Sequence, residues 1–106
     1  MTIEQQIINL LGLATRARKT ISGEELVIRE VRRQQAKLVI LANDASANTE
    51  KKVRDKCASF HVDLGVFGDR YELGHATGKE ARVVIAIMDH GFAKKLASLI
   101  NEYNRG

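Results

Sequence analysis

The side chains in this sequence that could do acid–base or metal chemistry are few and scattered. Asp44 and Asp89 each follow an apolar run and could meet at one edge of a sheet, as acidic pairs do in magnesium or phospho-acceptor sites. Turn and helix-cap roles explain each of them better. The three histidines lack the paired spacing of a metal site, and no phosphate-binding loop or G-x-G-x-x-G fingerprint occurs. We therefore expect no enzyme, no metal and no cofactor.

Basic side chains, in contrast, are concentrated in one part of the chain. Residues 16–37 hold seven basic and three acidic groups, and this excess of four positive charges equals the formal net charge of the whole protein. Such a cluster in an otherwise neutral domain is typical of nucleic-acid binding, although a solvated helix face is the alternative. Aromatic residues make up only 5% of the chain, which argues against an RNA platform built on stacking.

Residues 22–42 should fold as a helix followed by a buried strand. Ser22 and Glu25 have the spacing of a capping box, which predicts a helix from 23 to about 34. Glu25, Arg29 and Arg33 are then four residues apart on one polar face of that helix. After Lys37, the run LVILA has no polar alternation, as expected for a strand over 37–42 that is covered on both faces.

Helices and strands alternate along the rest of the chain. We expect helices over 3–17, 49–59 (capped by Asn48), 72–76 (capped by Asp69 with Glu72) and 91–103 (capped by Asp89). The last of these should bury Tyr103 among its apolar residues. Strands are expected over 19–21, 64–67 and 83–88. This order predicts one domain over residues 1–106, an α/β protein with a three-layer α/β/α sandwich around a sheet of about four strands.

The sequence also bears on where the protein works. No apolar run approaches the ~20 residues of a membrane span, and the N-terminus lacks a signal pattern. Cys57 is the only cysteine, which fits a reducing compartment, and its helical position favours a small buried hydrophobe over a nucleophile. We therefore expect a cytoplasmic protein that contacts no membrane. No feature indicates an obligate oligomer, so we expect a monomer.

Two stretches resemble the kink-turn RNA-binding family of ribosomal proteins. They are AKLVILAND at residues 36–44 and ELGHATGK at residues 72–79, the second followed by RVVIAIMD at residues 82–89. The family includes archaeal and eukaryotic large-subunit proteins and small bacterial relatives of the YlxQ type, to which the likeness is greatest. The likeness to this family covers roughly residues 7–103. The resemblance implies an α/β/α sandwich that binds RNA kink-turns, in which tandem sheared G·A pairs flank a three-nucleotide bulge.

The resemblance also implies which residues face the RNA. In the family, a Gly-x-Asn-Glu or Gly-x-Lys-Gln motif at the start of the second helix enters the groove at the G·A pairs, and a Lys or Arg lies four positions after its third residue. Gly23, Glu25, Leu26 and Arg29 occupy these positions here. Glu25 departs from the motif, because a carboxylate accepts from guanine N1 and N2 but cannot donate to O6. The loop that contacts the bulge in the family is 67–70 here, where Phe67 would either pack on a base or join the core.

The sequence thus predicts a non-enzymatic RNA-binding protein, with ribosomal RNA or another kink-turn RNA as its partner and ribosomal proteins as a further partner class. The alternative is a protein-interaction module of the translation or transcription machinery with only non-specific RNA affinity, which would account for the lost donor at Glu25. A third hypothesis is a small hydrolase that uses Asp44 and Asp89. The residues predicted to bind RNA are Lys19, Gly23, Glu24, Glu25, Arg29, Arg33, Lys37, Gly68, Asp69, Arg70 and Lys79.

Overall fold

The computed structural model describes residues 1–106, in which five helices alternate with four strands. None of the helices is long and apolar enough to cross a membrane. Every predicted element is present within two residues of its expected bounds, which confirms the α/β class. In chain order the elements are α1 (Ile3–Arg16), β1 (Thr20–Ser22), α2 (Glu24–Arg32), β2 (Leu38–Leu41), α3 (Ala47–Ser59), β3 (Asp63–Val66), α4 (Arg70–Ala76), β4 (Val84–Ile87) and α5 (His90–Arg105).

The four strands form one mixed sheet in the order β1-β4-β2-β3. β4 runs antiparallel to both of its neighbours, with Ile21 of β1 and Val39 of β2 opposite Ala86, whereas β2 and β3 are parallel. All residues of β2 and β4 are buried. The two apolar runs are therefore central strands covered on both faces, as predicted, and β1 and β3 form the edges of the sheet.

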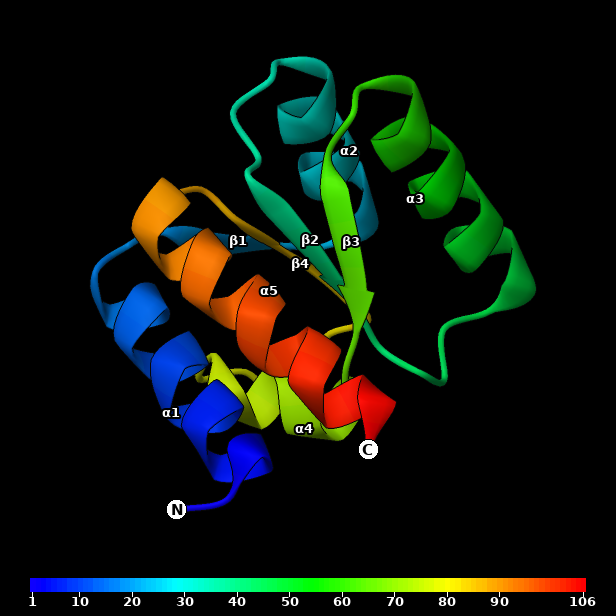
Figure 1. Cartoon of the computed structure of the whole chain (residues 1–106). Helices are drawn as coiled ribbons and strands as arrows, with labels where there is room; N and C mark the ends of the chain where they lie inside the picture. Colours follow the sequence, from blue (N-terminus) through cyan, green and yellow to red (C-terminus); the bar gives the residue numbers. More distant parts are fainter.

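Helices cover both faces of this sheet (Figure 1). Successive side chains of a strand point to opposite faces, so each central strand contributes to two cores. Ile40 and Ile85 pack on the face covered by α1, α4 and α5, and Val39 and Ala86 pack on the face covered by α2 and α3. The predicted three-layer α/β/α sandwich with four strands is confirmed.

The side chains that begin the helices agree in part with the predicted caps. Asp69 accepts from the amide of Glu72 while the Glu72 carboxylate accepts from the amide of Asp69, as the D-x-x-E pattern predicted. Asp89 caps α5, also as predicted, by accepting from the amide of Phe92. The cap predicted for α3 was wrong. Ser46 rather than Asn48 is the N-cap, and its Oγ accepts from the Thr49 amide at 3.2 Å, so α3 begins two residues early.

Phe67 belongs to the core, where its side chain is only 1% exposed. Its ring meets the ring of Tyr103 edge-on, with the centroids 5.2 Å apart. Tyr103 was predicted to be buried but is 39% exposed. It lies in the last turns of α5, where the contact with Phe67 leaves part of its ring open to solvent.

The strand directions separate Asp44 from Asp89 and overturn the prediction that they meet. β2 and β4 are antiparallel, with Leu38 opposite Ile87 and Leu41 opposite Val84, so the two strands end at opposite ends of the sheet. Asp44 pairs with Arg70 and Asp89 caps α5. No group of three His, Cys, Asp or Glu side chains is arranged to hold a metal ion. The hydrolase hypothesis, which required Asp44 and Asp89 in one site, is therefore not supported.

Candidate nucleic-acid interface

The start of α2 has open backbone amides. Gly23 is the N-cap, with φ 100° and ψ 141°, and no side chain caps the helix. The predicted capping box of Ser22 and Glu25 was therefore wrong. Ser22 ends β1, and its Oγ accepts instead from Arg82 Nε at 2.9 Å. The first amides of a helix carry partial positive charge and need partners, so the uncapped start of α2 is suited to a negatively charged ligand.

The two acids that begin α2 have different surroundings. Glu24 turns toward α3, where its carboxylate accepts from Thr49 Oγ1 and Lys52 Nζ, each at 2.8 Å. Both hydrogen bonds lower the pKa of Glu24, and the one from Lys52 has the larger effect. Glu25 is exposed and makes no ion pair, and Leu26 beside it is 44% exposed. Glu25 and Leu26 are thus the side chains that α2 presents to a partner next to Gly23.

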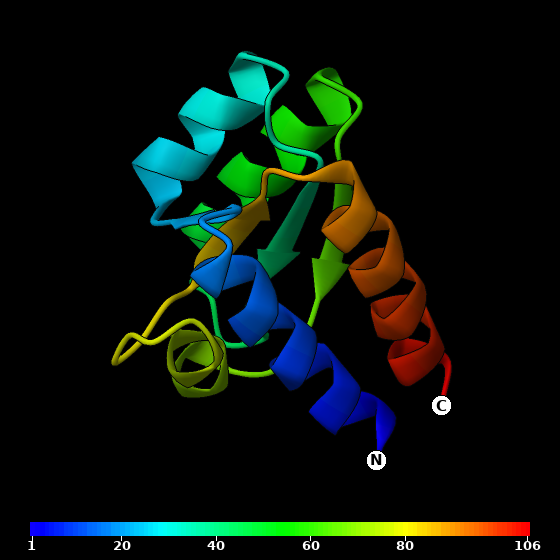
Figure 2. The same ribbon diagram turned by 90° about the vertical axis from the view of Figure 1, so that its left-hand side faces the viewer.

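The loop between α4 and β4 lies beside this helix start. Arg82 joins the loop to β1 through Ser22, and its backbone amide donates to the carbonyl of Arg70 at 2.8 Å. Gly78 follows the C-cap of α4 with φ 75°, in the left-handed region that glycine favours, and leads to the exposed side chain of Lys79. Figure 2 shows this loop (yellow) projecting on the same side of the molecule as the start of α2.

The segment Gly68 to Arg70 is held by its own neighbours. The Gly68 carbonyl accepts from the amide of Asn43, and the Asp69 carboxylate is used in the cap of α4. Arg70 Nε pairs with Asp44 Oδ2 at 3.0 Å, and its Nη2 donates to the Asp44 carbonyl at 2.9 Å. The charge of Arg70 is therefore largely compensated, although its side chain remains 40% exposed.

Arg29 and Arg33 share one carboxylate on α2. Arg29 Nε and Arg33 Nη1 lie 3.1 and 3.0 Å from Glu30 Oε2, and Glu30 is 6% exposed. Both arginine side chains remain more than 60% exposed, so they can still face a phosphate. Arg29 also lines a groove of about 430 Å³ between α2 and α3. The groove is lined by Glu24, Glu25, Ile28, Arg29, Arg32, Lys52 and Lys56.

Lys52 and Lys56 were not among the predicted site residues. They belong to a run of cations in α3 that also contains Lys51 and Arg54. Their i, i+4 spacing places them on one side of the helix, and in the structure that side faces α2. That spacing is the signal that separates them from Lys51 and Arg54, which pair with acids of α3 itself.

The predicted residues do not form one surface. The amide of Gly23 donates to the carbonyl of Val84, at the start of β4. The carbonyl of Lys19 accepts from the amide of Met88, and the amide of Lys37 donates to the carbonyl of Ile87, at the other end of β4. Gly23, Glu24, Glu25 and Lys79 therefore gather at one end of the sheet, whereas Lys19 and Lys37 lie at the other end.

Comparison with known proteins gives a consistent result. The model of the ribosomal protein L7Ae/L30e/S12e/Gadd45 family matches residues 5–97. The chain is 58% identical over 92 residues to "RNA-binding protein YlxQ" of Bacillus subtilis (strain 168), a match that covers 87% of this chain and 92% of the relative. It is 48% identical over 96 residues to the protein of the same name from Enterococcus faecium, covering 91% of this chain and 92% of the relative.

Two solved structures have the same fold. A protein of unknown function from Bacillus halodurans matches with a TM-score of 0.88 and 49% identity, over 90% of this chain and 96% of that one. The Giardia lamblia 15.5kD RNA binding protein matches with a TM-score of 0.79 and 21% identity, over 97% of this chain and 88% of that one. At that identity the Giardia protein supports the fold alone.

Proposed function

The chain belongs to the ribosomal protein L7Ae/L30e/S12e/Gadd45 family, and from this we infer that it is an RNA-binding protein that recognises kink-turn-like elements of structured RNA. The two relatives above are both named as RNA-binding proteins. Ribosomal RNA is the ligand we propose first, because the family is named for ribosomal proteins. The surface we assign to this recognition is the uncapped start of α2 together with the α4–β4 loop.

The observation that carries this proposal is the open helix start beside a loop fixed in place by Arg82. A Cβ atom on Gly23 would meet nothing within 4 Å, so an RNA backbone can approach the α-carbon of this residue closely. Phosphate groups bind well at such a helix start, because amide donors and the helix dipole act together. Lys79 and Arg29 then neutralise neighbouring phosphates.

Base recognition is assigned to Glu25. An exposed carboxylate on the first turn accepts from the N1 and N2 protons of a guanine whose edge is turned into the groove. Leu26, exposed beside it, covers the same base pair with an apolar surface. Glu25 thus provides a hydrogen-bond acceptor at the position where the family motif would provide an amide donor. It therefore selects a guanine edge that presents protons.

The first experiment is a titration of a labelled kink-turn RNA, beside an RNA whose G·A pairs are changed to Watson–Crick pairs. We expect the change to weaken binding by more than ~2 kcal/mol. Glu25→Ala should remove most of this difference, whereas Glu102→Ala, which removes an exposed acid from α5, should keep it. Equal binding of wild-type protein to both RNAs, with strong salt dependence, would refute kink-turn recognition.

A second candidate function is supported by exposed apolar side chains. Leu26 is 44% and Tyr71 is 56% exposed, and the nearby cations Lys52 and Arg70 are already paired with acids. A protein-docking module of the translation or transcription machinery would use exposed apolar side chains of this kind. This function predicts weak RNA binding that does not change when the G·A pairs are replaced. Leu26→Ala should then weaken binding of the protein partner and leave RNA binding unchanged.

A further inference from the structure

The cations of this protein divide into paired and unpaired sets. Around the start of α2 and along α3, Lys51, Lys52, Arg54 and Arg70 each lie within 3.0 Å of a carboxylate oxygen. At the opposite end of the sheet, four cations make no ion pair. They are Arg18, Lys19, Lys37 and Lys94, which we call the basic end. Lys79 and Arg82 of the α4–β4 loop make no ion pair either, so unpaired positive charge is present at both ends of the sheet.

The fold assembles the basic end from three distant segments. Lys19 and Lys37 flank the last residues of β4, because their backbones bond to Met88 and Ile87, each at 2.8 Å. Lys94 lies in the second turn of α5, which starts directly after β4. Asp89, the acid that immediately precedes α5, uses its carboxylate to cap that helix. The four cations therefore lie at the same end of the sheet.

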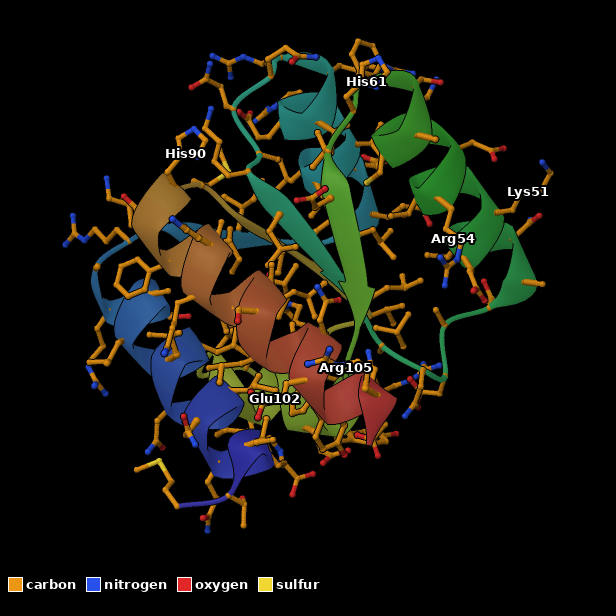
Figure 3. The ribbon with its side chains drawn as sticks, viewed as in Figure 1. Lys51, Arg54, His61, His90, Glu102 and Arg105 are labelled. Atoms are coloured by element: carbon orange, nitrogen blue, oxygen red, sulfur yellow. The ribbon has the colours of Figure 1, made fainter.

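A hollow of about 610 Å³ opens at this end of the molecule. Lys37 and Lys94 line it together with His61 and His90, and Asp63 is the only acid in its wall. Figure 3 shows His61 and His90 at this end, on segments that flank the hollow. The hollow is wide and open rather than a closed ligand pocket. It is suited to a ribose–phosphate segment that lies across it.

A second groove connects the basic end to the base-recognition surface. It has a volume of about 240 Å³ and runs beside the edge strand β1, from Arg18 to Lys79. The hydroxyl residues Thr15, Thr20 and Thr77 line it between these two cations. Because Lys79 belongs to the α4–β4 loop, a strand that leaves that loop enters this groove directly. No acidic side chain lines the groove.

We propose that the basic end is a second RNA contact, which binds the sugar–phosphate backbone of the strand that leaves the α2 and α4–β4 loop surface along β1. This inference rests on the proposed function. Lysine and arginine contacts to phosphates release counterions, and they strengthen binding without reading sequence. The basic end would therefore add electrostatic affinity to base recognition that takes place at the other end of the sheet.

The test compares two triple variants on a kink-turn RNA with a long flanking helix. Lys19→Ala/Lys37→Ala/Lys94→Ala removes three charges of the basic end. The matched control, Lys51→Ala/Arg54→Ala/Arg105→Ala, removes three charges that lie away from it (Figure 3). We expect the first variant to reduce the magnitude of the log–log salt slope by about two units, at roughly 0.7–0.9 for each phosphate contact, and the control to change it much less.

Further outcomes separate this inference from the proposed function. The basic-end variant should weaken binding to the kink-turn RNA and to its G·A-substituted partner by the same factor, of about tenfold or more at low salt. Replacing the three lysines by arginine should restore wild-type binding. An RNA trimmed to the kink alone should bind both triple variants equally.

An unchanged slope in a folded basic-end variant overturns the second contact while leaving kink-turn recognition intact. That result would assign the basic end to an acidic protein instead. A wild-type protein that binds no RNA overturns the proposed function, and the second contact with it. Circular dichroism of each variant confirms that the comparison is made between folded proteins.

Discussion

Arg82 and Ser22 join two segments that lie sixty residues apart, with Arg82 Nε 2.9 Å from Ser22 Oγ. Because Ser22 immediately precedes Gly23, this hydrogen bond fixes the α4–β4 loop beside the start of α2. The backbone amide of Arg82 bonds in addition to Arg70, so one residue ties together β1, the loop and α4. The proposed recognition surface therefore depends on a partly buried side chain rather than on the flexible Lys79 alone.

Arg82→Met should weaken kink-turn binding about tenfold and reduce the free energy of unfolding by about 1–2 kcal/mol, because it breaks the bond to Ser22. Ser22→Ala removes the same bond and keeps the guanidinium charge. If Arg82 acts by positioning the loop, Ser22→Ala should reproduce most of the loss with an unchanged salt slope. Wild-type binding by Ser22→Ala would show that Arg82 acts through its charge instead.

Gly23→Ala should cost about 1–3 kcal/mol of stability, because φ 100° with ψ 141° is a conformation that only glycine adopts easily. The cost comes from the backbone, since a Cβ atom at this position would meet nothing within 4 Å. Gly78→Asn is the matched control, because its φ of 75° lies in the left-handed region that asparagine tolerates. Urea denaturation of both variants tests this. Equal stability of Gly23→Ala and the wild type would contradict it.

Local patterns predicted helix caps only where no distant partner competed. Asp69 and Glu72 form the box expected from their spacing, because both side chains stay within their own turn. Ser22 and Glu25 have the same spacing, yet Ser22 bonds to Arg82 sixty residues later. Glu24 likewise turns away to α3. These tertiary contacts are invisible in the sequence and leave α2 uncapped.

Charge counting located the basic segment correctly but not the surface that it forms. A helix of nine residues advances about 13 Å, so α2 carries the chain from one end of the sheet to the other. Lys19 and Lys37 therefore lie together, while Gly23, between them in sequence, lies at the opposite end. The prediction that Asp44 and Asp89 meet was wrong for the same reason, because strand directions could not be read from the sequence. The antiparallel pairing of β2 and β4 separates them.

The ion pair of Glu24 and Lys52 should stabilise the protein only over a middle range of pH. The pKa of Glu24 is lowered by its bonds to Lys52 and Thr49, so the stabilisation is present above the ordinary value of 4.5 and is lost as pH falls through the lower folded-state value. The pKa of Lys52 is raised by Glu24, so the stabilisation is lost again as pH rises beyond 10.5.

A double-mutant cycle with Glu24→Gln and Lys52→Met measures this coupling. The coupling free energy should be favourable at pH 7 and should decrease as pH falls below 4.5, in urea titrations at low salt. The exposed pair of Lys51 and Asp55 within α3 serves as the comparison. A coupling of Glu24 to Lys52 that is absent at pH 7 would show that the contact between α2 and α3 gains nothing from this pair.

Cys57 should resist alkylation in the folded protein, because burial raises the pKa of its thiol to about 11. The unfolded chain ionises near the ordinary value of 9.0, so between pH 9 and 11 the protein should lose stability as pH rises. Iodoacetamide labelling at pH 8, followed by mass spectrometry with and without urea, tests the first point. Rapid labelling of the folded protein would show that α3 opens locally from the sheet.

Gly74→Ala should disturb the recognition surface from within. A Cβ atom on Gly74 would lie 2.6 Å from Ala81 Cα and 2.7 Å from Ala81 N, so α4 and the loop that carries Lys79 and Arg82 must move apart. Such overpacking costs about 1–3 kcal/mol, and the displaced loop should also bind kink-turn RNA less tightly.

Gly12→Ala is the matched control for this substitution. It lies within α1, and its added Cβ would come no closer than 3.7 Å, to the carbonyl of Ala76. Alanine favours a helix over glycine by about 1 kcal/mol, so this variant should be at least as stable as the wild type. Thermal unfolding and RNA titration of both variants provide the test. If Gly74→Ala binds RNA like Gly12→Ala, the close contact of α4 with the loop is not what positions Arg82.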